Sequence, residues 1–370
     1  MVGEKKKVAV AVSGGVDSSV TAALLQERGY QVFGVTMDLG SPQEVASSYD
    51  GKAKKDEDSS LSREVKEGER VCRHLGIPHQ VIDLKKDFKS KVINYFIKEY
   101  QGGRTPNPCV VCNRHIKFGS LMEEAFSLGA HYLATGHYAR LSFDQAHRKY
   151  FLEKARDEGK DQTYFLYELT QDHLEKSIFP LGDYLKEEVQ ELARKWGLPA
   201  AGKPESQEIC FIEDNDYKGF LLRQGDISYQ PGPFYSTSGE RLGTHQGLPF
   251  YTIGQRKGLG LAVGYPLYVI HMDCAKNAII LGRKEELLAR GLTAGRVNYI
   301  LEEIKEATRL EVKIRYRSPQ VEAVLYPLEG GKVRLEFKDP QRAVTPGQAA
   351  VFYQGNLLLG GGIIEERLPL

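Results

Sequence analysis

The sequence predicts an α/β protein: a Rossmann-like parallel-sheet domain, then a small β-rich central domain and a C-terminal β-barrel domain. Apolar runs alternate with helix-like segments four times within about the first 140 residues, which is typical of a parallel sheet covered by helices on both faces. After about Glu213 glycine and proline become frequent, and from about Lys276 the chain alternates like short strands. We therefore expect domains at residues 1–212, 213–275 and 276–370.

The first domain is expected to hold four buried strands. These strands are predicted at residues 6–12, 31–37, 79–84 and 131–135. Apolar residues at helical spacing predict helices between them, and a further helix should end at Gly197. Residues 41–63 are polar and charged with almost no apolar periodicity, which predicts an exposed insertion. In the last domain, strands are read at residues 310–317, 332–338 and 348–354.

Composition excludes several classes of protein. The 370 residues carry a net charge of +1, with 41% hydrophobic and 27% charged residues, an ordinary globular balance. No apolar run approaches the roughly 18 residues that span a bilayer, and the N-terminal pattern does not match a signal peptide. Five cysteines in this length do not form a disulfide scaffold. We expect a cytoplasmic protein with no membrane partner.

The strongest single motif is SGGVDSS at residues 13–19, between a predicted strand and a predicted helix. Backbone N–H groups of such a turn converge on an anion, and the helix N-terminus adds partial positive charge. Asp17 is a candidate for holding a metal or for fixing the turn. The motif lacks the lysine of a Walker A loop and does not match GxGxxG. It predicts a phosphate-binding loop, with an ordinary glycine-rich turn as the alternative.

Three cysteines lie in polar segments. Cys109 and Cys112 form a CxxC pair directly after TPNP. A zinc site would need more ligands than one CxxC supplies, and a thioredoxin-like redox pair or two ordinary loop cysteines are further alternatives. We favour a nucleophile with a lowered pKa, in a loop at a helix start near Arg114 and Lys117. Cys210, in ESQEIC, is either a small buried hydrophobe or a partner of the CxxC pair.

Residues 309–317 are predicted to form a basic stripe. Arg309, Glu311, Lys313, Arg315 and Arg317 occupy alternate positions, so a strand would place them on one face. Such a stripe suits an RNA phosphate backbone. The alternative is a solvated edge strand protected by charge.

In their order along the chain, these motifs resemble those of the tRNA-specific 2-thiouridylase family of PP-loop ATP pyrophosphatases. The matching segments are SGGVDSS, GRTPNPCVVCN, ATGHYA, GKDQTYFLY, KPESQEICFI, YTIGQRKGLGL and TPGQAAVFY, spread from residue 13 to 353. The resemblance covers nearly the whole chain outside the insertion. It implies a PP-loop domain that splits ATP, with Mg²⁺, into AMP and pyrophosphate. The activated group would be the wobble uridine of tRNA, which then receives sulfur.

The resemblance also implies roles for individual residues. The expected catalytic residues are Cys112, as the nucleophile, and Cys210, as the carrier of a persulfide. ATP binding is expected at Ala11, Val12, Ser13, Gly14, Gly15, Val16, Asp17, Ser18, Met37 and Gly136. The target base is expected beside Asn107, Pro108 and Cys109. Contacts with tRNA are expected from His137, Lys160, Asp161, Gln162, Arg315, Tyr316 and Gln348. Many relatives have aspartate where this chain has Cys109, so an acid or base role for that carboxylate is in doubt here.

The implied partners are the anticodon region of tRNA and a sulfur-relay protein that donates a persulfide. Two other functions compete with this one. A PP-loop amide-forming ligase, or another adenylating enzyme that modifies tRNA, needs no paired cysteines. A nucleotide sensor with an RNA-binding tail would not turn ATP over to AMP.

Overall fold

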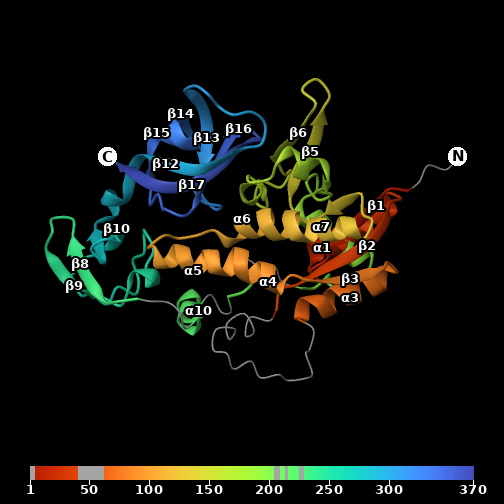
Figure 1. Ribbon diagram of the computed structural model, residues 1–370, viewed down its shortest axis with the longest axis horizontal. Helices are drawn as coiled ribbons and strands as arrows, with labels where there is room; N and C mark the ends of the chain where they lie inside the picture. Colours follow the sequence, from red (N-terminus) through yellow and green to blue (C-terminus); the bar gives the residue numbers. More distant parts are fainter. Residues whose placement is uncertain (1–4, 41–61, 204–208, 213–215, 225–228) are drawn as a thin grey trace. The chain divides into compact units, whose positions relative to one another are not determined.

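The computed structural model describes residues 5–40, 62–203, 209–212, 216–224 and 229–370. Nearly all of the predicted insertion at 41–63 lies outside the described residues. The chain divides into two compact units, whose elements are labelled in Figure 1. The first comprises Met1–Val92, Cys109–Asn215 and Asn356–Leu358, and the second comprises Ile93–Pro108, Asp216–Gly355 and Leu359–Leu370. The predicted boundaries after residues 212 and 275 stay predictions.

The first unit is built on a parallel sheet. Its strands are β1 (Lys7–Ala11), β2 (Gln31–Asp38), β3 (His79–Asp83), β4 (Tyr132–Ala134) and β7 (Ser177–Ile178). They lie in the order β3-β2-β1-β4-β7, and all four neighbouring pairs are parallel. The central strand β1 is apolar and almost fully buried, as expected for a strand covered on both faces. The predicted Rossmann-like sheet is confirmed.

Helices of the first unit follow the apolar spacing of the sequence. They are α1 (Val16–Glu27), α3 (Arg63–Leu75), α4 (Lys85–Phe88), α6 (Pro108–Cys112), α7 (Leu121–Ser127), α8 (Gln171–Glu175) and α9 (Lys186–Lys195). In α3 the buried residues Val65, Gly68, Val71 and Cys72 share one face, and Gly76 ends the helix with φ +66°. A hairpin of β5 (Ala139–Asp144) and β6 (Lys149–Lys154) completes the unit.

Two predicted helices are interrupted. Residues Lys89–Ile93 and Asn113–Ser120 form π-helical turns, each joined to α-helix at both ends. Gly119 breaks the second of them, with φ −103° and ψ −106°. Apolar periodicity does not distinguish these turns from α-helix, because both place one face toward the core. A π-helical turn is frequent at functional sites, and Asn113 directly follows Cys112.

The second unit contains two β structures. A four-stranded sheet has the order β10-β11-β8-β9, from β8 (Gly232–Ser236), β9 (Arg241–His245), β10 (Tyr268–Asp273) and β11 (Ala278–Gly282). A barrel follows, from β12 (Leu288–Tyr299), β13 (Thr308–Lys313), β14 (Val321–Leu328), β15 (Lys332–Arg342), β16 (Ala349–Gln354) and β17 (Leu357–Pro369). Its order is β12-β15-β14-β13-β16-β17, and pairing of β12 with β17 closes it.

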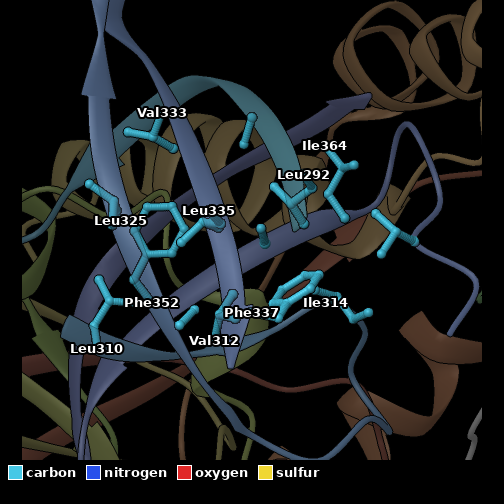
Figure 2. Packing of buried hydrophobic residues seen from close by; sticks show 14 of the residues in the cluster. Leu292, Leu310, Val312, Ile314, Leu325, Val333, Leu335, Phe337, Phe352 and Ile364 are labelled. Carbon is cyan, nitrogen blue, oxygen red and sulfur yellow. The ribbon is translucent and has the colours of Figure 1, made fainter. Parts of the chain in front are cut away.

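The barrel is filled by aliphatic and aromatic side chains. Leu292, Leu325, Leu335, Phe352 and Ile364 come from five different strands, and each is fully buried in one cluster (Figure 2). The expected C-terminal barrel is therefore confirmed, and so is the β-rich segment before it. The second unit also includes α5 (Asn94–Gln101) and α10 (Tyr217–Arg223), with the rings of Tyr100 and Tyr217 stacked 5.1 Å apart. None of the helices in the described ranges is long and apolar enough to cross a bilayer.

Candidate active site

The glycine turn connects β1 to α1 at the carboxyl end of the sheet. Gly14 has φ +74°, and Gly15 begins α1 without a side chain to cap it. The Ser18 hydroxyl accepts from the backbone N–H of Ser13 at 3.2 Å and donates to the carbonyl of Gly15 at 3.2 Å. These bonds fix a tight turn whose backbone N–H groups and helix N-terminus favour an anion.

Two positions of this turn region leave little room for a side chain. A Cβ atom on Gly14 would overlap the Cβ of Glu67, and one on Gly136 would lie 3.0 Å from the backbone of Asp17 and Ser18. Gly136 follows β4, the neighbour of β1, while β2 lies on the other side of β1. The turn therefore sits where the strand order reverses, which is where open α/β sheets bind ligands. Met37, half-buried, is the last residue but one of the neighbouring strand β2.

Asp17 fixes the turn. Both its carboxylate oxygens accept from Lys186 Nζ, at 2.7 and 2.9 Å, and Oδ1 also accepts from the Tyr138 hydroxyl at 2.9 Å. Lys186 is buried, so its charge depends on this partner. Within the described ranges, no group of three or more His, Cys, Asp or Glu side chains is arranged to hold a metal. Of the two roles predicted for Asp17, the geometry favours the structural one.

Lys203 reaches the same turn from a distant part of the sequence. Its Nζ donates to the carbonyl of Gly14 at 3.1 Å and pairs with Glu67 Oε2 at 2.8 Å. Burial raises the pKa of the Glu67 carboxyl, but hydrogen bonds from Lys203 and Arg63 outweigh it and hold the pKa below its usual range. The sequence offers no reason to assign Lys203 a role, because nothing in it places residue 203 beside SGGVDSS.

The first unit also brings three cysteines together. Cys109 and Cys112 are half-buried in α6, a short helix that begins at Pro108, so they lie at a helix start, as predicted, but within the helix and not in a loop. Cys210 is exposed, and all five cysteines of the chain are free thiols. The thiols of Cys112 and Cys109 both act electrostatically on that of Cys210, so the CxxC pair and Cys210 share one neighbourhood.

The predicted lowering of the thiol pKa is wrong. Burial raises the pKa of Cys112 to about 11 and also raises that of Cys109, although Lys117 opposes both shifts. Cys210 keeps an exposed surface, yet the protein packed around its thiol removes water and raises its pKa to about 12. Desolvation disfavours the thiolate more strongly than one nearby cation favours it. The resting thiols are therefore protonated at neutral pH.

Of the two predicted cations, only Lys117 faces the thiols. It lowers the pKa of Cys109, Cys112 and Cys210. The Arg114 guanidinium instead lies 3.0 Å from Nδ1 of His173. Lys117 is thus the group positioned to stabilise a thiolate once one forms.

Alkylation of Cys112 by iodoacetamide should report this protonation directly. Because a raised pKa keeps the thiol protonated, the rate should climb about tenfold per pH unit from pH 7 to about pH 10. Peptide mass spectrometry would measure it, with a free cysteine peptide levelling off above pH 9 as the control. A Cys112 rate that levels off below pH 8.5 would contradict the burial effect.

Several residues expected to contact tRNA have structural partners in the first unit. His137 is buried, its Nδ1 lies 2.7 Å from the Thr135 hydroxyl, and burial holds its pKa well below the usual range. Asp161 is buried and accepts from the Thr163 hydroxyl at 2.8 Å. Gln162 Oε1 accepts from the backbone of Tyr138 at 3.0 Å. Burial does not favour a direct phosphate contact by His137 or Asp161. Half-buried Lys160 lies in the same loop.

Gln348, in the second unit, holds the start of the TPNP segment. Its Nε2 donates to the carbonyls of Thr105 and Pro106, at 2.9 and 3.2 Å. The Thr105 N–H donates to the Pro346 carbonyl at 2.9 Å, and a Cβ atom on Gly347 would lie 2.8 Å from Thr105 O. The barrel residues 346–348 therefore fix the backbone that leads to Asn107 and Pro108. A role of Gln348 at tRNA stays a prediction.

The basic stripe is shorter than predicted. Strand β13 ends at Lys313, and residues 314–318 form bends and turns. Within the strand, buried apolar residues alternate with charged ones as predicted: Leu310 and Val312 are buried, while Arg309 is exposed. Arg315 lies beyond the strand, and its guanidinium donates to the carbonyls of Arg342 and Ala343. Half-buried Tyr316 lies under Lys313, whose Nζ is 5.7 Å from the ring centre.

The parallel sheet, the glycine turn at its switch point and the clustered thiols define a nucleotide-binding domain of the PP-loop type that is equipped for thiol chemistry. Comparison with known families agrees. Residues 6–214 match the model of a tRNA methyl transferase HUP domain, residues 218–283 a tRNA methyl transferase PRC-barrel domain, and residues 289–364 an aminomethyltransferase beta-barrel domain.

Full-length relatives give the family. The tRNA-specific 2-thiouridylase MnmA of Carboxydothermus hydrogenoformans is 50% identical over 367 residues, covering 98% of this chain and 99% of that protein. The one of Moorella thermoacetica is 50% identical over 359 residues, covering 96% and 99%. A solved 4-thiouridine synthetase complexed with RNA and bound ATP is 17% identical, covers 60% of this chain and 51% of that chain, and has a TM-score of 0.37. The chain belongs to the tRNA-specific 2-thiouridylase family, which confirms the resemblance.

Proposed function

We propose that this chain uses ATP to activate the 2-carbonyl oxygen of the wobble uridine of tRNA and then replaces that oxygen with sulfur from a cysteine persulfide. Family membership supports tRNA thiolation. The observation that carries the finer proposal is that one compact unit holds both the glycine turn and the thiols of Cys112 and Cys210. A phosphate site alone would suit many adenylating enzymes, whereas two neighbouring thiols suit sulfur transfer.

The first step forms a leaving group. The 2-carbonyl oxygen attacks the α-phosphorus of ATP, the uridine becomes adenylated, and pyrophosphate departs. The backbone N–H groups of the glycine turn would bind the departing pyrophosphate and stabilise the negative charge that develops on it. The glycines at positions 14 and 136 support this role, because a side chain at either would overlap or crowd the turn. Met37, at the end of β2, would lie beside the nucleotide.

Sulfur arrives as a persulfide on Cys210, written Cys210–S–SH. In one route its outer sulfur attacks C2 of the uridine, AMP leaves, and the Cys112 thiolate attacks Sγ of Cys210, which frees the thiolated base. In the other route Cys112 attacks Sγ of Cys210 first and expels hydrosulfide, which then attacks C2 and displaces AMP. Both routes end with a Cys112–Cys210 disulfide, which a dithiol must reduce.

The described residues do not offer a metal site of their own, since Asp17 is engaged by Lys186 and no cluster of metal-binding side chains is present among them. Mg²⁺ therefore enters this proposal only as the counter-ion of the ATP phosphates, the usual arrangement for this ion. No step of the mechanism depends on it.

The proposed partners are tRNA and a protein that delivers the persulfide. The target uridine would have to leave the anticodon stack to reach the thiols, as bases do in other enzymes that modify them. Asn107, Pro108 and Cys109 would lie beside that base. Cys210 is exposed as a residue, which supports delivery by a protein. The protein packed around its thiol must then move aside, because a donor persulfide must touch the accepting sulfur.

ATP labelled at the α-phosphate tests the first step. With unmodified tRNA and a persulfide donor, the purified chain should release labelled AMP and unlabelled pyrophosphate, because attack at the α-phosphorus breaks the bond to the β-phosphate and sulfur then displaces AMP. Thin-layer chromatography would measure the products, with a reaction lacking tRNA as the control. Release of ADP and phosphate would contradict the proposal.

A further inference from the structure

We infer that Lys203 is a pyrophosphate ligand of the glycine turn and supplies the positive charge that the SGGVDSS motif itself lacks. The inference rests on the proposed function, because it names a ligand of the same nucleotide site. It extends that function by naming a cation outside the motif that would bind the outer phosphates.

The geometry places the ammonium group at the turn. Lys203 Nζ lies 3.1 Å from the carbonyl oxygen of Gly14 and 2.8 Å from Oε2 of Glu67. Its side chain is 30% exposed, so the group reaches solvent at the edge of the turn. An ammonium has three donors, and among the described residues these two oxygens engage two of them. A third donor is available to a phosphate oxygen held by the backbone of the turn.

The other charges of the turn are balanced differently. Asp17 is compensated by Lys186, a buried lysine whose Nζ lies 2.7 Å from Oδ1, so that pair adds no net charge. Glu67 is paired both with Lys203 and with Arg63, whose Nε lies 3.1 Å from Oε1. When Lys203 turns toward a phosphate, Arg63 therefore remains to compensate Glu67. A lysine can exchange the Glu67 carboxylate for a phosphate oxygen, because its compact charge lies at the end of a flexible side chain.

Isothermal titration calorimetry of the full chain with inorganic pyrophosphate and with AMP tests the inference. The dissociation constant for pyrophosphate should rise about tenfold or more in Lys203→Met, the scale of one lost charge-assisted hydrogen bond. AMP, which lacks the two outer phosphates, should bind as in the parent chain. Lys66→Met is the matched control, since it removes an exposed lysine from the helix that carries Glu67, and it should leave both affinities unchanged.

The outcomes are separable. If Lys203→Met binds pyrophosphate as tightly as the parent, or loses AMP and pyrophosphate affinity equally, Lys203 is not a phosphate ligand, while the proposed function stands. If the parent chain binds no pyrophosphate, both fail.

Reductive methylation of the parent chain gives a measurement that does not depend on how the variant folds. Peptide mass spectrometry should show Lys203 protected by pyrophosphate and not by AMP. Equal modification of Lys203 with and without pyrophosphate would overturn the inference.

Discussion

The Cys210→Ser variant should form no 2-thiouridine, while it still binds tRNA and ATP. The loss should be at least about a thousandfold, the scale on which removal of a catalytic nucleophile acts. A serine oxygen cannot carry a persulfide, so no labelled sulfur should appear on the protein after exposure to a persulfide donor. Cys112→Ser should accept the persulfide and then stall, because no second thiol can resolve it. Mass spectrometry of the intact protein and of tRNA nucleosides measures both results.

Two other cysteines serve as controls. Cys72 is buried in α3, where burial raises its pKa to about 11, and Cys274 is exposed with its thiol donating to the carbonyl of Gly102. Cys72→Ala and Cys274→Ser should keep thiolation, since neither thiol is among the groups that act on Cys210. The choice within the CxxC pair would be wrong if Cys109→Ser abolished turnover and Cys112→Ser did not.

Gly14→Ala should weaken ATP binding more than about tenfold, whereas Gly29→Ala should not. The two glycines share a left-handed backbone, with φ +74° and +82°, so alanine is strained to a similar degree at both. They differ in their surroundings, because a Cβ atom on Gly14 would overlap Glu67 and one on Gly29 would meet nothing within 4 Å. Gly29→Ala is expected to lose about 1 kcal/mol of stability, the cost of the left-handed conformation.

Comparison of Gly14→Ala with Gly29→Ala separates the effect of a distorted glycine turn from the effect of backbone strain. Calorimetry with a non-hydrolysable ATP analogue and thermal unfolding of both variants measure binding and stability separately. In Gly14→Ala the turn must move away from Glu67. Its affinity for the ATP analogue should therefore be more than about tenfold lower than that of Gly29→Ala. Equal affinities for the two variants would show that the phosphate groups bind elsewhere.

Strands β1 to β4 of the first unit could be predicted from sequence because each is a short apolar run with a glycine or polar break. The hairpin strands β5 and β6 and the two-residue strand β7 were not predicted. The run at Lys7–Ala11 is so buried that its composition alone identifies it. Strand β13 was predicted too long, since alternation continues to Arg317 in the sequence. The Arg315 guanidinium binds the carbonyls of Arg342 and Ala343, and this long-range contact decides the backbone there.

The candidate site was only partly predictable. The glycine turn is local, so its motif carries its geometry. The contribution of Lys203 could not be predicted, because its contact with Gly14 joins residues 189 positions apart in the sequence. The thiol pKa values were predicted in the wrong direction for the same reason. Sequence shows that Lys117 is near Cys112, whereas the burial that dominates comes from the rest of the unit.

Oxygen-18 placed at the 2-carbonyl of the wobble uridine tests the central claim most directly. A synthetic anticodon stem-loop with this label, incubated with the chain, ATP and a persulfide donor, should yield 2-thiouridine and AMP in equal amounts. If the uridine oxygen attacks the α-phosphorus, it leaves with the phosphate, so the AMP should carry the label. Unlabelled AMP alongside 2-thiouridine, or the label in inorganic phosphate, would contradict adenylation of the base.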